Sequence, residues 1–148
     1  MKPKVYEFEV YKDDGWLIAE PFDLDGGTQG EDYEDLCAMV ADWLKVTVED
    51  HAIRGIEMPK PTFGNAPRHG GSILLVCVMA GLETVERVSA AEAARMLGVS
   101  AGRVSQMLAS GQLEGWRDGH SSYVTLDSLR ARMAAPREAG RPRAVACA

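Results

Sequence analysis

Arg103 and Gln106 are the residues whose chemistry is most informative in this sequence. They lie in residues 101–109, where apolar Val104 and Leu108, four positions apart, predict the buried side of a helix. In the major groove of duplex DNA, arginine can form two hydrogen bonds with guanine and glutamine two with adenine. The alternative interpretation is an ordinary solvated helix face. The residues expected to contact DNA from this helix are Ser100, Ala101, Arg103, Ser105 and Gln106.

The residues before this helix predict a second helix and a sharp turn that together present it. Ser89 and Glu92 have the spacing of a capping box, and they open a helix whose core positions are Ala93, Ala94 and Leu97. Gly98 stands where the chain must stop and turn, in the left-handed conformation that glycine adopts at little cost. We expect Val99 to fill the angle between the helices and Ser100 to cap the second one.

A hairpin is predicted directly after the second helix. Residues 113–117 and 122–124 read as two strands around an Asp118-Gly119 turn, and Trp116 is expected to fix the hairpin on the helices. Thr125 then caps a last helix that contains Leu126, Leu129 and Met133. The residues at the hairpin tip are of types that contact phosphate, namely Arg117, His120, Ser121 and Ser122.

The acidic residues of the front half raise the possibility of a metal-dependent nuclease. Such a site needs several carboxylates that converge on Mg²⁺. Glu7 and Glu9 are expected to face outward from a strand, and Asp23 and Asp25 to lie on a loop. We therefore predict no catalytic residue, no metal site and no cofactor, and a protein that is not an enzyme.

Cysteine and histidine residues give no sign of a metal centre. The three cysteines, Cys37, Cys77 and Cys147, form no CxxC or Cys/His cluster, which favours a reducing compartment. Cys37 is interpreted as a packed or idle thiol, and His51, His69 and His120 as isolated. The longest apolar run spans only residues 73–81, and no secretion signal is recognised at the start, so the expected location is the cytoplasm.

The front half predicts an antiparallel sheet packed by one helix. Residues 5–10 alternate between apolar and polar side chains and pair with residues 16–21 through an Asp14-Gly15 turn. A glycine-rich connection over residues 23–30, with room for a short third strand, leads to a helix that begins with a Thr28/Glu31 capping box and ends near residues 51–55. Residues 61–71 are expected to form a loop, and residues 72–79 a buried strand that completes the sheet; a fragment of helix is the alternative, less favoured because the run is short and bounded by glycines. The side chains expected to pack in this half are Trp16, Leu36, Val40, Trp43, Leu44 and Val48.

Charge divides the chain into two parts. Residues 1–66 contain six Lys and Arg against 15 Asp and Glu, a net charge of −9, whereas residues 67–148 contain ten Arg against seven Asp and Glu, a net charge of +3. The front part would attract a basic partner and the back part tolerates phosphate. The alternative is that the acidic residues only solvate the front part.

Residues 88–135 resemble the excisionase and MerR-type winged helix-turn-helix. The resemblance is carried by residues 88–94 (VSAAEAA), 97–100 (LGVS), 110–113 (SGQL), 118–124 (DGHSSYV) and 126–129 (LDSL). It implies binding to double-stranded DNA, with the helix after Gly98 as the recognition helix that contacts the bases and the hairpin as the wing. The family often has more basic residues in the reading helix than the single Arg103.

The front half resembles the HicB-like antitoxin domain through residues 6–10 (YEFEV), 15–24 (GWLIAEPFDL), 28–36 (TQGEDYEDL) and 56–61 (IEMPKP). The resemblance implies a partial ribonuclease H-like fold, neutralisation of a small basic HicA-like toxin that cleaves mRNA, and repression of the protein's own operon. The glycine stretch is shorter than is usual in that family. The predicted organisation is an α+β protein with a HicB-like domain over residues 1–81, a winged helix-turn-helix over 85–135 and a disordered tail over 136–148.

Three functions are compatible with these features. The first is an antitoxin-type transcriptional regulator; the second is a stand-alone or excisionase-like DNA-binding factor with an oligomerising front domain; the third is a nuclease. A neighbouring gene for a small basic protein would favour the first over the second. Because one winged domain has little positive charge, we also expect a homodimer or larger homo-oligomer, held through the open sheet edge of the front domain.

Overall fold

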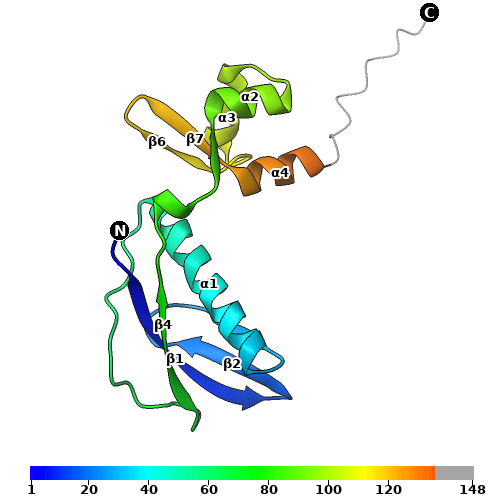
Figure 1. Cartoon of the computed structure of the whole chain (residues 1–148). Helices are drawn as coiled ribbons and strands as arrows, with labels where there is room; N and C mark the ends of the chain where they lie inside the picture. The colour runs from blue at the N-terminus through cyan, green and yellow to red at the C-terminus, as the bar shows by residue number, and fades with distance from the viewer. Residues whose placement is uncertain (136–148) are drawn as a thin grey trace, which may run out of the picture. The chain divides into compact units, whose positions relative to one another are not determined.

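The computed structural model describes residues 1–135, which fold into two compact units (Figure 1). The first unit is Met1–Val85 and the second begins at Glu86. Both units combine helices with antiparallel strands, so the predicted α+β class is confirmed. The predicted tail over residues 136–148 lies outside the described residues. Within residues 1–135, no helix has both the length and the apolar character needed to cross a bilayer.

The first unit contains a four-stranded antiparallel sheet in the order β3-β2-β1-β4. The strands are β1 (Lys4–Asp13), β2 (Trp16–Pro21), β3 (Thr28–Gly30) and β4 (Ser72–Val78), and the long helix α1 spans Tyr33–Arg54. The predicted hairpin of β1 and β2 is confirmed, with Asp13 opposite Trp16 across a two-residue turn at Asp14 and Gly15.

Helix α1 packs on one face of this sheet. Its Leu36, Val40, Leu44 and Val48 are buried at helical spacing, as predicted. They meet Tyr6, Phe8 and Val10 of β1 with Leu17 and Ala19 of β2, and the Trp43 ring lies edge-on to Phe8 at 5.8 Å between centroids. The core of the unit therefore lies between α1 and alternate residues of the two central strands. Trp16, in contrast, is 39% exposed, so its predicted packing role is wrong.

The start of α1 differs from the prediction. Thr28 belongs to β3 and does not cap the helix; the N-cap is Asp32, whose Oδ1 accepts a hydrogen bond from the Asp35 amide at 2.8 Å. Gly30 explains the shift, because a Cβ there would lie 2.5 Å from the backbone nitrogen of Leu36. Only glycine lets strand and helix approach so closely. The predicted end of the helix is confirmed, since Gly55 closes α1 in the left-handed conformation.

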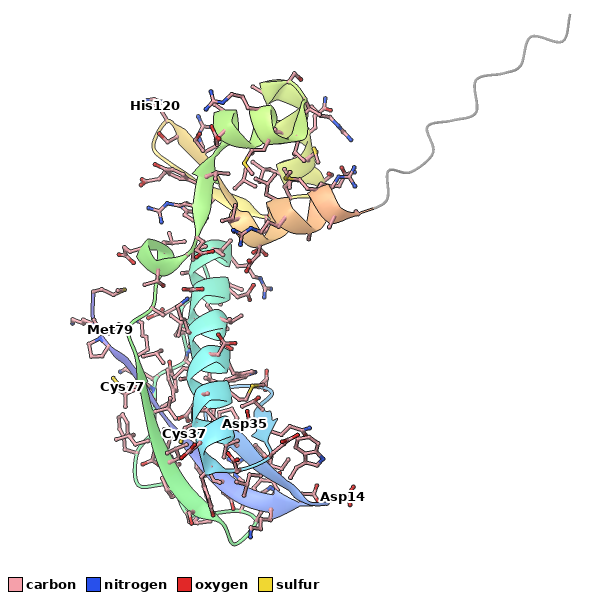
Figure 2. All side chains as sticks on the ribbon, turned by 45° about the vertical axis from the view of Figure 1, so that its right-hand side comes forward. Asp14, Asp35, Cys37, Cys77, Met79 and His120 are labelled. Atoms are coloured by element: carbon pink, nitrogen blue, oxygen red, sulfur yellow. The ribbon has the colours of Figure 1, made fainter. Side chains whose placement is uncertain are left out.

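Strand β4 completes the sheet, as predicted, but it is not buried. It pairs with β1 and forms one edge of the sheet, with Leu74, Val76 and Val78 directed toward the core. The alternate residues face away from α1 and are exposed: Ile73 is 40% and Leu75 59% exposed, and Cys77 is also exposed (Figure 2). The apolar residues of β4 are therefore buried on one side of the strand only, and those on the other side are uncovered.

The second face of β1 is covered by residues 59–71, here called the crossing segment. This segment runs the length of the sheet from the end of α1 to the start of β4 (Figure 1). Glu7 and Glu9, which were expected to face solvent, are only 7% and 1% exposed beneath it. That expectation was wrong because alternation shows which face a residue occupies, but not whether a distant loop covers that face.

Each carboxylate accepts three hydrogen bonds from N–H donors of the crossing segment. Glu7 accepts from the amides of Gly64 (2.6 Å) and Asn65 (3.0 Å) and from the Asn65 side chain (2.9 Å). Glu9 accepts from the amides of Arg68 (2.7 Å), His69 (2.8 Å) and Gly71 (2.9 Å). Hydrogen bonds to an ionised carboxylate are about twice as strong as neutral ones, so these two residues fix the loop to the strand.

Further contacts hold the rest of the crossing segment. The Tyr6 hydroxyl donates to the Pro59 carbonyl, and Asp23 accepts from the amide and the hydroxyl of Thr62, each at 2.8 Å. The His69 ring stacks on Tyr11 at 4.1 Å between centroids, with its Nε2 3.4 Å from the Glu20 carboxylate. His69 had been expected to be isolated, but it packs within this segment.

The hydrogen bonds set the protonation of the two carboxylates. The Gly64 amide and then Asn65 hold the pKa of Glu7 below its ordinary value. Burial alone would raise the pKa of Glu9, but the amides of Arg68, Gly71 and His69 together outweigh it and lower that pKa. Both groups are thus carboxylates in the folded protein at neutral pH.

The dependence of stability on pH tests the hydrogen bonds that Glu7 and Glu9 accept from the crossing segment, here called the carboxylate clamp. Because both folded-state pKa values are depressed, the stabilisation is fully present above the unfolded pKa of about 4.3 and is lost as pH falls through the folded values. The double variant Glu7→Gln/Glu9→Gln is expected to unfold at lower urea than the wild type at pH 7, with a shallower decline in acid. Exposed Glu57→Gln is the control and should match the wild type. An unchanged acid profile in the double variant would contradict the clamp.

Candidate nucleic-acid interface

The second unit presents one helix on a tightly defined turn. Strand β5 (Arg87–Ser89) leads into α2 (Ala90–Leu97), and α3 (Ala101–Ser110) follows after three residues. The Ser89 side chain accepts from the Glu92 amide at 3.1 Å, while the Glu92 carboxylate pairs with Arg95. Strand β5 was not predicted, because three residues give too short a pattern to detect.

Gly98 makes the turn between α2 and α3 possible. It has φ of 67°, and the amide of the next residue, Val99, donates to the Ala94 carbonyl at 3.0 Å. Ser100 then caps α3 by accepting from the Arg103 amide at 3.1 Å. Val99 is 37% exposed, so it does not fill the angle between the helices as expected.

The outward face of α3 consists of small and polar side chains. Val104 and Met107 are buried and Leu108 is half-buried, which places the core side of the helix one residue away from the predicted Val104/Leu108 pair. The exposed residues of the helix are Ala101, Gly102, Arg103, Ser105, Gln106, Ala109 and Ser110. Ser100, Ala101, Arg103, Ser105 and Gln106, all predicted to contact DNA, are thus exposed at one end of this module.

Arg103 lies between two glutamine side chains. Its guanidinium is 3.5 Å from Oε1 of Gln106 and 3.5 Å from Oε1 of Gln112, at the long limit of a hydrogen bond. These weak contacts orient the guanidinium without occupying it strongly. Gln112, which follows α3, was missed from the sequence because nothing in a turn residue's type shows which helical residue it will lie beside.

A two-stranded hairpin follows α3. Strands β6 (Gly115–Asp118) and β7 (Ser121–Thr125) pair with β5 in a three-stranded sheet of order β5-β7-β6. The turn is formed by Gly119 and His120, one position later than predicted, and His120 stands at the tip (Figure 2). Of the predicted tip residues Arg117, His120 and Ser121 are exposed, whereas Ser122 is half-buried. The Arg117 Nε donates to the Gly119 carbonyl at 3.1 Å, which holds this side chain against the turn.

Trp116 packs within the sheet rather than on the helices. Its ring lies 5.6 Å from that of Tyr123 on the neighbouring strand, and the Arg87 guanidinium lies over both rings at 5.5 and 5.2 Å. This stack of one cation and two aromatic rings ties β5 to the hairpin. Trp116 had been expected to fix the hairpin on the helices, whereas the ring contacts it makes are with neighbouring strands of the sheet.

Helix α4 (Leu126–Ala134) closes the core of the second unit. Thr125 caps it as predicted by accepting from the Ser128 amide at 3.3 Å. The helix contains Leu126, Leu129 and Met133 as predicted; Leu129 is fully buried, Leu126 is half-buried and Met133 is 52% exposed. The buried residues of this core are Ala93, Ala94, Val104, Met107, Leu113, Val124 and Leu129.

The remaining acidic, cysteine and histidine side chains that could carry out chemistry either make structural contacts or lie apart from one another. Glu7 and Glu9 hold the crossing segment, Asp23 holds Thr62, and Cys37 and Cys77 are exposed free thiols. His51 Nδ1 lies 2.8 Å from the Thr47 carbonyl one helical turn earlier. Within residues 1–135, no group of three His, Cys, Asp or Glu side chains is arranged to hold a metal ion.

Comparison with known proteins gives one similar structure. No model of a known protein family matches the sequence, and no curated protein matches it significantly. A chain described as "Toxin-Antitoxin complex from Streptococcus pneumoniae" aligns over 75% of this chain and 99% of its own length, with 18% sequence identity and a TM-score of 0.47. At this level of identity and superposition, the similarity does not identify a function.

The geometry of the turn can be tested with a matched pair of glycine variants. Gly98→Ala places a Cβ on a left-handed residue and is expected to destabilise the protein by about 1–2 kcal/mol. Gly102→Ala lies at the exposed second position of α3, where a new Cβ meets only the Ser100 Oγ at 3.9 Å, so it should stabilise, by less than the roughly 0.5–1 kcal/mol of a mid-helix position. Urea unfolding followed by circular dichroism measures both. Equal effects of the two variants would contradict the described turn.

Proposed function

We propose that this protein is a DNA-binding transcriptional regulator in which residues 86–135 form a winged helix-turn-helix. The observation that carries the proposal is the outward face of α3: seven exposed residues, of which only Arg103 and Gln106 have long side chains. Such a helix fits a major groove about 12 Å wide, and its two long side chains are those suited to guanine and adenine. The exposed hairpin tip supplies the residue types that contact the DNA backbone.

We propose further that the first unit acts as a HicB-type antitoxin domain. Its resemblance to that family and its net charge of −9 over residues 1–66 support a small basic toxin as the partner. In this proposal the protein is not an enzyme, works in the cytoplasm without a cofactor, and represses the operon that encodes it and the toxin. The hydrogen-bonded state of Glu7 and Glu9 agrees with a structural rather than a catalytic use of these acids.

Arg103 is the residue whose loss should separate specific from non-specific binding. Arg103→Ala is expected to weaken binding to a selected duplex by about 1–3 kcal/mol and to relax base preference at one position. The preferred duplex is first obtained by selection from a random pool, and affinities are then measured by fluorescence anisotropy. Arg95→Ala, which removes an equal charge from α2, is the control and should keep the wild-type base preference. If Arg103→Ala leaves the DNA footprint unchanged, α3 is not the reading helix.

A dimer would compensate for the weak charge of a single DNA-binding module. Residues 86–135 carry six Arg against five Asp and Glu, a net charge of only +1. We propose that two copies join through β4, an edge strand without a charged residue, in antiparallel pairing centred on the exposed Leu75, so that the two Leu75 side chains lie opposite each other and exposed Ile73 of one copy lies opposite exposed Cys77 of the other. Two modules held together can bind half-sites about 34 Å apart with a gain in affinity.

A charge introduced on β4 tests this interface. Leu75→Glu is expected to convert the dimer to a monomer in light scattering at micromolar concentration, because the two new carboxylates would lie opposite each other. Val46→Glu, at a 54% exposed position of α1, is the control and should remain dimeric. A wild-type protein that is monomeric both alone and on DNA would refute the proposed dimer.

A further inference from the structure

A hollow of about 480 Å³ lies beside α3 in the second unit. It is bounded by the α2–α3 turn, the start of α3 and the last turn of α4. Its apolar wall includes Met96, Val99, Met107 and Met133, and two guanidinium groups, Arg103 and Arg132, line it as well. No Asp or Glu is among its lining residues, so the hollow combines an apolar wall with positive charge alone.

Arg132 differs from most arginines of the second unit, which contact another side chain or a backbone carbonyl. Arg95 pairs with Glu92, Arg130 is 3.9 Å from Glu86, Arg117 donates to Gly119 and Arg87 lies over two aromatic rings. Arg132 makes no hydrogen bond, ion pair or ring contact with any residue in 1–135. A cation without a partner in the described part of the chain, lining the same hollow as the residue proposed to read bases, is available to an anion supplied by a ligand.

We infer that Arg132 binds a phosphate of the DNA backbone next to the segment that α3 reads, so that the interface extends over the last turn of α4. This inference rests on the proposed function. Arg103 and Arg132 line the same hollow from two different helices, so a duplex that engages Arg103 brings its backbone toward the hollow. The chemistry required of the ligand is one phosphodiester anion flanked by apolar sugar edges, which suits an arginine set among methionine and valine side chains.

The two arginines have separable roles. Arg103 would contact base edges and determine sequence, while Arg132 would contact phosphate and determine only position and strength. Each phosphate that a protein neutralises on duplex DNA contributes about −0.9 to the slope of log K against log salt concentration. A phosphate contact is therefore measurable as a change of slope, independently of base preference.

The test compares two variants on α4 that remove the same charge. Arg132→Gln is expected to reduce the magnitude of the salt slope by about 0.9 while the sequences selected from a random duplex pool stay as in the wild type. Arg130→Gln, two residues earlier and 65% exposed by side chain, should retain the wild-type slope. Since Arg132 lies in the last turn of α4, thermal unfolding of both variants checks for a purely structural effect through the helix dipole.

Three outcomes would overturn the inference. A wild-type slope for Arg132→Gln means that no phosphate is bound there. Equal slopes for Arg130→Gln and Arg132→Gln, both reduced, mean that only net charge matters. Wild-type protein that selects no duplex refutes the proposed function together with the inference, whereas selective wild-type binding with an unchanged Arg132→Gln slope refutes the inference alone.

Discussion

The fold of the first unit depends on two carboxylates that are buried under a loop. Six N–H groups of the crossing segment, five of them backbone amides, converge on Glu7 and Glu9. A loop over a sheet face must satisfy its own amides, and two carboxylates two residues apart on β1 do this without a further strand. The segment can then return the chain along the whole sheet and start β4 beside β1.

Much of the architecture was readable from local patterns, and the errors share a physical cause. The β1–β2 hairpin, the apolar stripe of α1, the Ser100 and Thr125 caps and the Gly98 turn depend on neighbours within a few residues, and all are present. Glu7 and Glu9 were misjudged because their donors lie 57 to 62 residues away. The short strand β5 is defined only by its pairing with β7, and the exposure of β4 only by its place at the edge.

The sequence predicted which residues of the candidate site are exposed better than it predicted which residues lie around them. Sequence spacing placed Arg103 and Gln106 on an exposed helix face, which is where they lie. It could not place Gln112 beside Arg103, nor bring the end of α4 to the hollow that Arg103 lines. Periodicity describes one helix at a time, whereas a binding surface is formed by side chains from several elements.

The uncharged edge of β4 also affects the solubility of the chain. Edge strands of soluble proteins usually carry lysine, proline or a bulge that prevents further strands from adding, and Ser72–Val78 contains no lysine and no proline. The free edge of this strand offers an almost entirely apolar template for amyloid-like growth. A high protein concentration, or an accumulation of folding intermediates, would therefore threaten solubility before it threatened the core.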